Sequence, residues 1–251
     1  MIPAARKEQI KNAVKTAGFV SASELATLLD SSLSTVRRDL IELERDGFLV
    51  RTRGGGQSVS PTVAAAMSRA LEHSDEKMRI AKKAVDLIAE AGCIVLDAGT
   101  TTLTVARLLY PTKPLRVITD SIEIAYELKD RENTNVFVVG GILHPLSYNL
   151  CGGISEQMLE NMRAQICVMG GVGLSVKSGL TKHDVDAFPV KRKMIDISHE
   201  LVCVVDSSKF DVAGLYSVCP IERVDIVITD TGIHQDFRAA LEGAGCEVIV
   251  V

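Results

Sequence analysis

The sequence predicts an α/β fold in two parts: a small, mainly helical N-terminal domain and a doubly wound, mostly parallel α/β domain. Three observations support this prediction. Residues 1–56 contain short amphipathic helical patterns separated by capping residues, residues 57–74 are rich in serine and alanine, and residues 75–251 alternate short apolar runs with helical patterns. We therefore expect one domain at 1–56, a linker at 57–74 and a second domain at 75–251.

Two short helical patterns open the N-terminal domain. The range 6–17 is amphipathic and stops before Gly18, a residue type that often follows the last turn of a helix. A second helix is expected after Ser21 or Ser23, because either hydroxyl can cap it, and the polar break at 30–31 ends it.

A third helix is predicted after Ser32, and it carries candidate DNA contacts. Its apolar positions fall on one side, so that polar side chains project from the other. Two short helices separated by about four residues, with exposed arginines on the second, form the layout of a helix-turn-helix whose recognition helix enters the major groove. The groove-facing candidates are Ser34, Thr35, Arg37 and Arg38.

The segment after this helix predicts a wing. Residues 48–53 alternate apolar and polar side chains and are followed by Gly54-Gly55-Gly56, as in a short strand that leads into a flexible strip. Arg51 and Arg53 in this segment are further candidate DNA contacts. The alternative for the whole region is a small helical bundle with ordinary surface arginines.

Charge is divided unevenly along the chain. The 251 residues carry a formal net charge of −4, yet residues 1–56 hold 9 Lys and Arg against 7 Asp and Glu. An acidic protein has little non-specific affinity for nucleic acid, so DNA binding must come from a local surface. Assembly of several copies of the chain would bring two such surfaces together. We therefore expect two partners, a double-stranded DNA operator and further copies of the chain in a homo-oligomer, a dimer or a tetramer.

Composition indicates a globular protein outside the membrane. Hydrophobic residues make up 47% of the chain, which suffices for a substantial core, and no apolar run reaches the 18 residues of a membrane span. The first residues, Met-Ile-Pro-Ala-Ala-Arg-Lys, lack the apolar stretch of a signal peptide. We expect a cytoplasmic protein with no membrane partner.

The six cysteines do not indicate a metal site. They form no Cys-x-x-Cys pair, and no histidines lie at zinc-finger spacing, so no metal is expected. Four of them, Cys93, Cys167, Cys203 and Cys246, lie in or beside apolar runs, where a reduced thiol packs as a small core residue. Redox sensing is the alternative.

Seven short apolar runs predict the sheet of the larger domain. A long helix from Ser74 to about Gly92 precedes them, and helical patterns separate most of the runs. Continuous apolar strands joined by helices are typical of parallel sheets that are covered on both faces, and ligands bind such sheets at the carboxyl ends of the strands. The predicted strands are 93–96, 115–118, 136–139, 166–169, 201–205, 226–228 and 248–251.

The motif Asp97-Ala98-Gly99-Thr100-Thr101-Thr102 follows the first of these strands and precedes a helical pattern. A glycine turn, hydroxyl groups and the free amides of a helix N-terminus together suit a phosphate. Asp97 would repel a phosphate and is better suited to a sugar hydroxyl. The alternative is a helix cap with incidental threonines.

Other polar or glycine-rich segments follow the later strands. They would place bare backbone and small polar groups along one edge of the sheet, together with cations, and so predict a pocket for a phosphorylated sugar or polyol. Besides the motif at 97–102, the candidates are Thr119, Asp120, Ser121, Gly140, Gly141, Gly170, Gly173, Lys191, Asp206 and Lys209.

Three N-terminal segments form a recognisable signature: Glu24-Leu25-Ala26, residues 34–44 (Ser-Thr-Val-Arg-Arg-Asp-Leu-Ile-Glu-Leu-Glu) and residues 47–55 (Gly-Phe-Leu-Val-Arg-Thr-Arg-Gly-Gly). With them the chain resembles, across nearly its whole length, the DeoR family of bacterial transcriptional regulators. The resemblance implies a sugar-phosphate-sensing C-terminal domain similar in fold to ribose-5-phosphate isomerase, with the candidate residues named above in matching positions. The chain departs from the family at Asp120, where asparagine is more common, and at Ala187-Phe188-Pro189.

The expected function is a DNA-binding transcriptional regulator, a repressor of sugar or polyol metabolism genes that responds to a phosphorylated sugar and needs no cofactor. One alternative is a sugar-phosphate isomerase-like enzyme, with Asp97 or Asp206 as base and Lys191 or Lys209 stabilising an enediolate. Against it, an isomerase has no use for a winged helix-turn-helix. A second alternative is an architectural DNA-binding protein without an effector.

Overall fold

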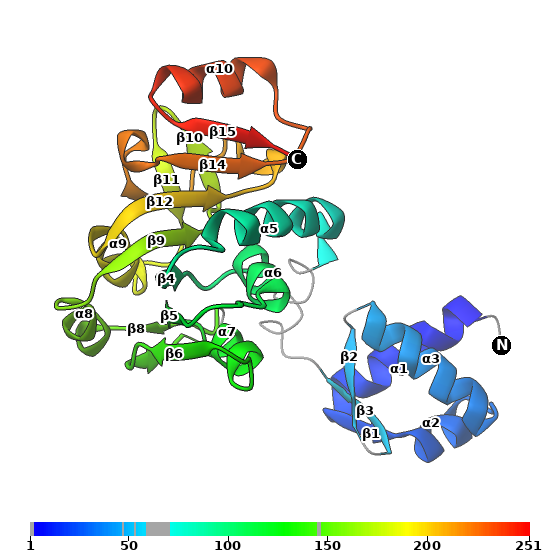
Figure 1. Cartoon of the computed structure of the whole chain (residues 1–251). Helices are drawn as coiled ribbons and strands as arrows, with labels where there is room; N and C mark the ends of the chain where they lie inside the picture. Colours follow the sequence, from blue (N-terminus) through cyan, green and yellow to red (C-terminus); the bar gives the residue numbers. More distant parts are fainter. Residues whose placement is uncertain (1–2, 47, 53, 59–70, 145–146) are drawn as a thin grey trace. The chain divides into compact units, whose positions relative to one another are not determined.

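The computed structural model describes residues 3–46, 48–52, 54–58, 71–144 and 147–251 (Figure 1). The chain divides into two compact units, Met1–Glu72 and His73–Val251, and each is described by itself. Most of the predicted linker, 59–70, lies outside the described residues. The domain boundaries inferred from the sequence therefore stay predictions.

Up to Ser58, the described residues of the first unit form three helices and a small antiparallel sheet. The three predicted helices are confirmed, and their inward faces form one apolar core around Ile10, Leu25 and Leu43. The strands lie in the order β1-β3-β2. The elements are α1 (Pro3–Ala17), β1 (Phe19–Ser21), α2 (Ala22–Leu28), α3 (Leu33–Arg45), β2 (Leu49–Thr52) and β3 (Gly55–Ser58).

Serine side chains fix the starts of α2 and α3. The Ser21 hydroxyl accepts a hydrogen bond of 3.1 Å from the amide of Glu24, and the Glu24 carboxylate accepts one of 2.8 Å from the amide of Ser21. This reciprocal arrangement is a capping box, so Ser21 rather than Ser23 is the N-cap of α2. Ser32 caps α3 by accepting from the amide of Thr35 at 3.2 Å.

The predicted flexible strip at Gly54–Gly56 is wrong for its last two residues. Gly55 and Gly56 begin β3, the middle strand of the small sheet. A Cβ atom on Gly55 would lie 2.1 Å from the carbonyl oxygen of Val20, so the absence of a side chain is what lets β3 approach β1. The short strand β1 was not predicted, because three residues are too few to show an alternation.

The second unit is built on a seven-stranded sheet in the order β15-β14-β12-β9-β4-β5-β6. Every strand pair in it is parallel, and all seven predicted strands are confirmed to within a few residues. The strands are β4 (Cys93–Leu96), β5 (Leu115–Thr119), β6 (Thr134–Val138), β9 (Ala164–Met169), β12 (Ser198–Val204), β14 (Ile226–Thr229) and β15 (Glu247–Val250).

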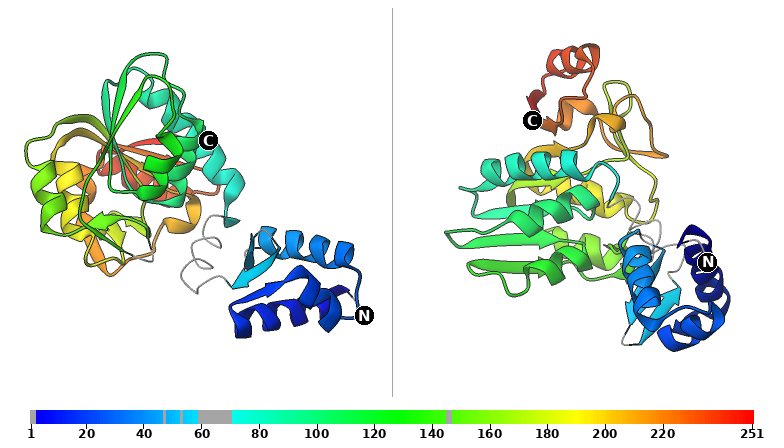
Figure 2. Two further views of the ribbon diagram at one scale, coloured as in Figure 1. Left: turned by 90° about the horizontal axis from the view of Figure 1, so that it is seen from below. Right: turned by 90° about the vertical axis from the view of Figure 1, so that its right-hand side faces the viewer.

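Helices cover both faces of this sheet, as a doubly wound fold requires (Figures 1 and 2). Helices α5, α6 and α7 pack on one face with Ile94 and Leu96 of β4, whereas α8, α9 and α10 pack on the other with Val95. Successive side chains of β4 therefore pack into two different hydrophobic cores, one on each face of the sheet. The helices are α5 (Ser74–Ile88), α6 (Thr100–Leu108), α7 (Ile122–Leu128), α8 (Gly153–Leu159), α9 (Phe188–Asp196) and α10 (Gln235–Gly243).

Short antiparallel elements that the sequence did not predict follow the carboxyl ends of β6 and β9. A hairpin of β7 (Ile142–Leu143) and β8 (Leu150–Cys151) comes after β6, and a three-stranded sheet in the order β10-β11-β13 begins after β9. The strands of that sheet are β10 (Gly173–Ser175), β11 (Gly179–Lys182) and β13 (Tyr216–Cys219). Two short 3-10 helices, η1 (Ser207–Lys209) and η2 (Ile221–Arg223), lie on either side of β13 in the sequence.

All six thiols are reduced, and five of them are buried. Burial raises the pKa of each thiol, in Cys219 to about 11, so the reactive thiolate is disfavoured. This agrees with the prediction of packed thiols. Within the part of the chain that the structure describes, no helix combines the length and the apolar character needed to cross a membrane.

Candidate functional site

Helix α3 presents the predicted DNA contacts on one side. Arg37, Arg38 and Ser34 are exposed, while Val36, Leu40 and Leu43 of the same helix are buried in the core. Thr35 is half-buried, and its hydroxyl lies 2.8 Å from that of Ser32. The polar face predicted from periodicity is therefore present on the helix.

The wing supplies one described arginine. Arg51 lies on β2, is exposed, and donates its amide to the Glu44 carboxylate at 2.7 Å. Its guanidinium lies 3.7 Å from the same carboxylate, which ties the wing to the last turns of α3. Arg53, the other predicted wing contact, lies outside the described residues.

Two ion pairs hold α3 against α1. The guanidinium of Arg6 meets both carboxylate oxygens of Asp39, at 2.5 and 3.2 Å, and Lys7 pairs with Glu42 one turn later. Asp39 is buried, although it directly follows the exposed Arg38. A two-point contact of this kind fixes the rotation of the helix as well as its position. This pairing of α1 with α3 was not predicted from the sequence.

In the second unit the strand order reverses between β4 and β9. From β4 the chain adds β5 and β6 on one side, and from β9 it adds β12, β14 and β15 on the other. Ligands of such sheets bind at this switch point, outside the carboxyl ends of the strands. Asp97 follows β4 and Gly170 follows β9, so the predicted site lies at the switch point.

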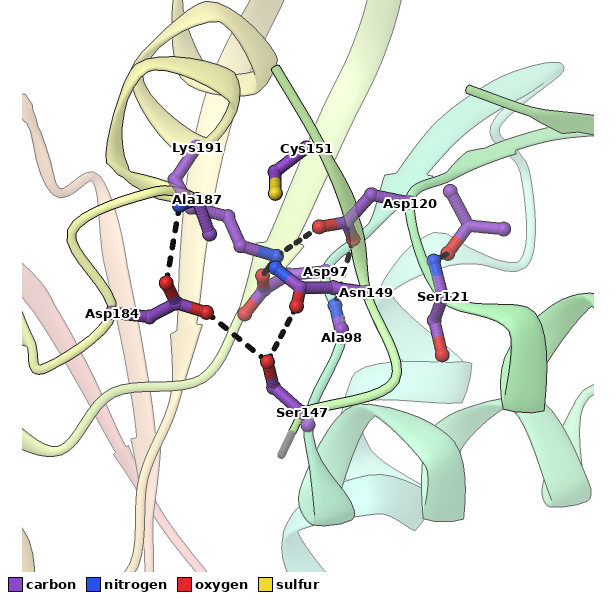
Figure 3. A network of polar contacts seen from close by, with 12 residues as sticks. Asp97, Ala98, Asp120, Ser121, Ser147, Asn149, Cys151, Asp184, Ala187 and Lys191 are labelled. Carbon is purple, nitrogen blue, oxygen red and sulfur yellow. Dashed lines mark hydrogen bonds and ion pairs between the residues drawn. The ribbon is translucent and has the colours of Figure 1, made fainter. Parts of the chain in front are cut away.

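Four charged side chains meet there, and we call Asp97, Asp120, Lys182 and Lys191 the ion cluster. The ammonium of Lys191 contacts Oδ1 of Asp97 and Oδ2 of Asp120 (Figure 3), and the ammonium of Lys182 contacts Oδ2 of Asp97. The contact of Lys191 with Oδ1 of Asp97 is an ion pair without the alignment of a hydrogen bond. Both carboxylates are fully buried and Lys191 is 2% exposed.

Charge pairing outweighs burial within the ion cluster. Burial alone would raise the pKa of Asp97, but the ammonium groups of Lys182 and Lys191 hold it below its usual value. Burial alone would lower the pKa of Lys191, but Asp120 and Asp97 raise it above its usual value. Asp97 and Lys191 are therefore both ionised at neutral pH.

The backbone fixes the two carboxylates. Oδ1 of Asp120 accepts from the amide of Ala98 at 3.1 Å, and the Asp120 carbonyl accepts from the amide of Leu150 at 2.7 Å. Oδ2 of Asp97 accepts from the amide of Gly170 at 3.3 Å. Asp120 is thereby joined to the loop after β4 and to the β7–β8 hairpin.

The threonine motif starts α6 but offers fewer hydroxyls than predicted. Gly99 is the N-cap, and no side chain caps the helix. Thr102 is fully buried and donates to the carbonyl of Gly99 at 3.0 Å, and Thr101 is also buried. Only Thr100 of the three is partly exposed, so the uncapped amides of α6 and one hydroxyl remain for a ligand.

The hydroxyls after β5 serve the fold. Thr119 donates to the carbonyl of Leu96 at 2.7 Å and accepts from the amide of Ser121 at 3.1 Å. Ser121 in turn caps α7 by accepting from the amide of Ile124 at 3.2 Å. Both side chains are buried, so their position at the strand end is as predicted but their hydroxyls are already engaged.

Two of the predicted glycines, Gly141 and Gly173, permit close approach of two chain segments. A Cβ on Gly141, where φ is 139°, would lie 2.5 Å from the carbonyl oxygen of Cys151, and one on Gly173 would lie 1.8 Å from that of Val212. Gly140 accepts from the Ser155 hydroxyl through its carbonyl. Gly170 differs from these, because its amide donates to Asp97.

Asp206 and Lys209 lie after β12, Asp206 as the N-cap of η1 and Lys209 as its last residue. Asp206 is buried and caps η1 by accepting from the amide of Ser208 at 3.1 Å, and Lys209 is half-buried. Among the contacts of the described residues, none joins either side chain to the ion cluster. Their predicted role in effector binding stays a prediction.

Comparison with known proteins identifies the family. Residues 6–62 match the model of the DeoR-like helix-turn-helix domain, and residues 72–231 match the model of the DeoR C terminal sensor domain. The chain belongs to the DeoR family.

Relatives of this DeoR-family chain are regulators, not enzymes. It is 32% identical to the putative aga operon transcriptional repressor of Escherichia coli O157:H7, over 98% of this chain and 93% of that one. It is 31% identical to the transcriptional regulator GolR of Listeria innocua, over 99% and 98%, and to the transcriptional repressor GlcR of Bacillus subtilis, over 92% and 90%. The sequence-based expectation of a transcriptional regulator is confirmed.

Solved structures give a weaker likeness. Ribose 5-phosphate isomerase A of Methanocaldococcus jannaschii shares 20% identity with a TM-score of 0.41, over 55% of each chain. The fold assignment therefore depends on the DeoR models and on the seven-stranded parallel sheet itself.

Two charged residues of this DeoR chain, Lys182 and Asp230, were not predicted from the sequence. Lys182 was missed because it ends β11, in a sheet that was not predicted. Asp230 could have been found, since it directly follows β14 as Asp97 follows β4. It accepts from the amides of Ser207 and Gly232, at 2.6 and 2.9 Å, and these bonds lower its pKa despite its burial.

A second polar group flanks the ion cluster. Asp184 accepts from the Ser147 hydroxyl at 3.1 Å and from the amide of Ala187 at 3.2 Å (Figure 3). In the described chain, potential metal-ligating atoms of His144, Asp184 and Asp186 lie within 4.8 Å of one another. Asp184 of this group is held by a hydroxyl and an amide, and Nδ1 of His144 lies 3.5 Å from its Oδ2.

Proposed function

We propose that this DeoR-family protein represses genes of sugar or polyol metabolism, and that a phosphorylated sugar modulates its binding to an operator in double-stranded DNA. It would act in the cytoplasm as a homo-oligomer of two or four subunits. The observation that carries the proposal is the coexistence of an ion cluster and an uncapped helix N-terminus at the switch point of a sensor domain.

The DNA side of the proposal depends on the exposed face of α3. Arg37 and Arg38 have the forked donors that bind guanine edges or phosphates, and Ser34 and Thr35 lie near the helix N-terminus, where hydroxyls donate to phosphates. Arg51 and Arg53 of the wing would add phosphate contacts. Helix-turn-helix proteins bind paired half-sites as dimers, which is why we propose an oligomer.

The effector side depends on two different chemistries at the switch point. The amides at the start of α6, with Gly99 as N-cap and Thr100 beside it, can hold a phosphate. Carboxylates and ammonium groups of the ion cluster can accept from and donate to sugar hydroxyls. The remaining predicted residues around Asp206 and Lys209 would complete the pocket from the other side of the switch point.

Regulation requires the effector to distinguish two states. For release from DNA, it must bind the DNA-free arrangement of subunits more tightly than the DNA-bound one, by about 1 to 3 kcal/mol in typical allosteric proteins. Because the two units bind different ligands, effector binding in the second unit must change DNA binding by the first.

One experiment tests both halves of the proposal. Operator fragments are selected from genomic DNA by the purified full-length protein, and their affinity is measured by fluorescence anisotropy at fixed salt with a panel of sugar and polyol phosphates. We expect one compound to weaken operator binding. Specific binding that no compound changes would favour the architectural alternative, and no specific binding would refute the regulator.

A further inference from the structure

The ion cluster carries no net formal charge, since two carboxylates face two ammonium groups. Neither ammonium group is unpaired and available to an anion, because Lys191 contacts both carboxylates and Lys182 contacts Asp97. The carboxylates have no exposed surface, so water does not weaken these contacts.

A phosphate that bound Lys191 directly would have to displace a carboxylate. Asp97 would retain Lys182 after such a displacement, whereas Asp120 has only Lys191 as an ion-pair partner among the described residues. Asp120 would then be a fully buried carboxylate without a cation, which is strongly unfavourable.

Asp120 also has little freedom to turn away. Its Oδ1 accepts from the amide of Ala98, and its backbone carbonyl accepts from the amide of Leu150. A hydroxyl group can enter such a cluster more easily than an anion. It accepts from an ammonium and donates to a carboxylate, and it leaves the total charge unchanged.

We propose that Asp120 is a specificity-determining residue that keeps Lys191 paired and so restricts the ion cluster to uncharged hydroxyl groups. The ligand class is a sugar or polyol whose diol end contacts the ion cluster and whose phosphate lies elsewhere, at the start of α6. This inference rests on the proposed function and deepens it, because it names Asp120 as the residue that keeps the phosphate away from the ion cluster.

The test measures phosphate binding to the full-length protein by isothermal titration calorimetry, with inorganic phosphate alone as the probe. Asp120→Asn keeps the shape of the side chain and an oxygen for the Ala98 amide, but it leaves the cluster with one excess positive charge. Because one buried charge at contact distance is worth far more than a tenfold change in affinity, we expect phosphate to bind at least about tenfold more tightly.

Two matched variants assign the effect. Asp225→Asn makes the same chemical change before β14, at the opposite edge of the sheet, where Asp225 accepts from the amide of Leu201 at 2.7 Å, and should have no effect. The double variant Asp120→Asn with Lys191→Met should lose the gain, because Lys191 is the cation that Asp120 releases.

An unchanged phosphate affinity in folded Asp120→Asn, or a gain that survives in the double variant, would overturn the inference. Folding is checked by circular dichroism, and Asp120→Ser removes the same charge if the asparagine variant does not fold. These results do not depend on operator binding. A phosphate gain without any sugar phosphate that alters operator binding would therefore refute the proposed effector and leave the role of Asp120 intact.

Discussion

The amide of Gly170 donates a hydrogen bond of 3.3 Å to Oδ2 of Asp97, and this bond joins the ends of β9 and β4 where the strand order reverses. The same oxygen contacts Lys182, and the other oxygen of Asp97 contacts Lys191. One buried carboxylate thus connects two central strands, the antiparallel sheet through β11 and helix α9. A change at Asp97 would disturb the whole switch point.

Acid should weaken the second unit through Asp97. Its pKa is held below the usual value, so its contribution to the free energy of unfolding is present above the unfolded-state pKa, about 3.9, and is lost as the pH falls through the folded-state value. Lys182→Met should raise the pH of acid unfolding, measured by circular dichroism. Exposed Lys177, changed to Met, is the control, and equal shifts in both variants would contradict the assignment.

Replacing Arg37 or Arg38 by alanine should weaken operator binding. Each exposed arginine can contribute about 1 to 3 kcal/mol through a base contact, so we expect about a tenfold loss or more in anisotropy titrations at fixed salt. Arg45→Ala, near the C-terminal end of α3 and beside Asp46, is the control. If both variants kept full affinity, α3 would not be the recognition helix.

The capping box of α2 predicts unequal effects of two neighbouring serines. Ser21→Ala removes the acceptor for the amide of Glu24 and should lower the free energy of unfolding by about 1 kcal/mol. Ser23→Ala removes only a contact with the Ser21 hydroxyl and should cost less than about half of that. Thermal unfolding of both variants measures the two losses of stability. A larger loss in Ser23→Ala than in Ser21→Ala would show that Ser23 is the cap.

Gly55→Ala should separate β1 from β3. The added Cβ would lie 2.1 Å from the carbonyl oxygen of Val20, so the backbone must move, and we expect a loss of about 1 to 3 kcal/mol in the stability of the first unit. Gly243→Ala, at the end of α10, meets no atom within 4 Å and should be neutral or slightly stabilising. Similar melting temperatures for the two variants would refute the close approach.

The effector response should depend on Thr100 more than on its neighbours. Thr100→Val keeps the volume of the side chain but removes the one partly exposed hydroxyl of the motif, so the protein should bind operator normally and respond about tenfold more weakly to its effector. Thr104→Val removes a hydroxyl that donates to the Thr100 carbonyl at 2.9 Å and is the control. The measurement is effector titration of the operator complex.

The seven-stranded sheet could be predicted because its strands are buried on both faces. Ile94, Val95 and Leu96 are all fully buried, so they form a continuous apolar run that the sequence displays directly. The helix caps could also be predicted, because Ser21 and Ser32 each accept a hydrogen bond from an amide only three residues further along the chain.

Partners distant in the sequence could not be predicted. Lys182 reaches Asp97 from a sheet of three short strands, which show too few residues for a pattern. Thr119 and Gly173 both look like ligand-binding residues in the sequence. In the fold, the hydroxyl of Thr119 donates to the carbonyl of Leu96, and Gly173 lies against the backbone of Val212. Residue type alone does not show whether a polar group is already engaged.

The pairing of β4 with β9 has a consequence for the order in which the sheet assembles. Ile94 pairs with Ile166, although the whole of β5, β6 and the β7–β8 hairpin is made between them. Closing so long a loop is slow, and an unpaired strand edge invites wrong pairing. During synthesis β4 cannot pair with β9 before Met169 has been added, so a half-sheet of β4, β5 and β6 would have an open edge at β4 at least until then.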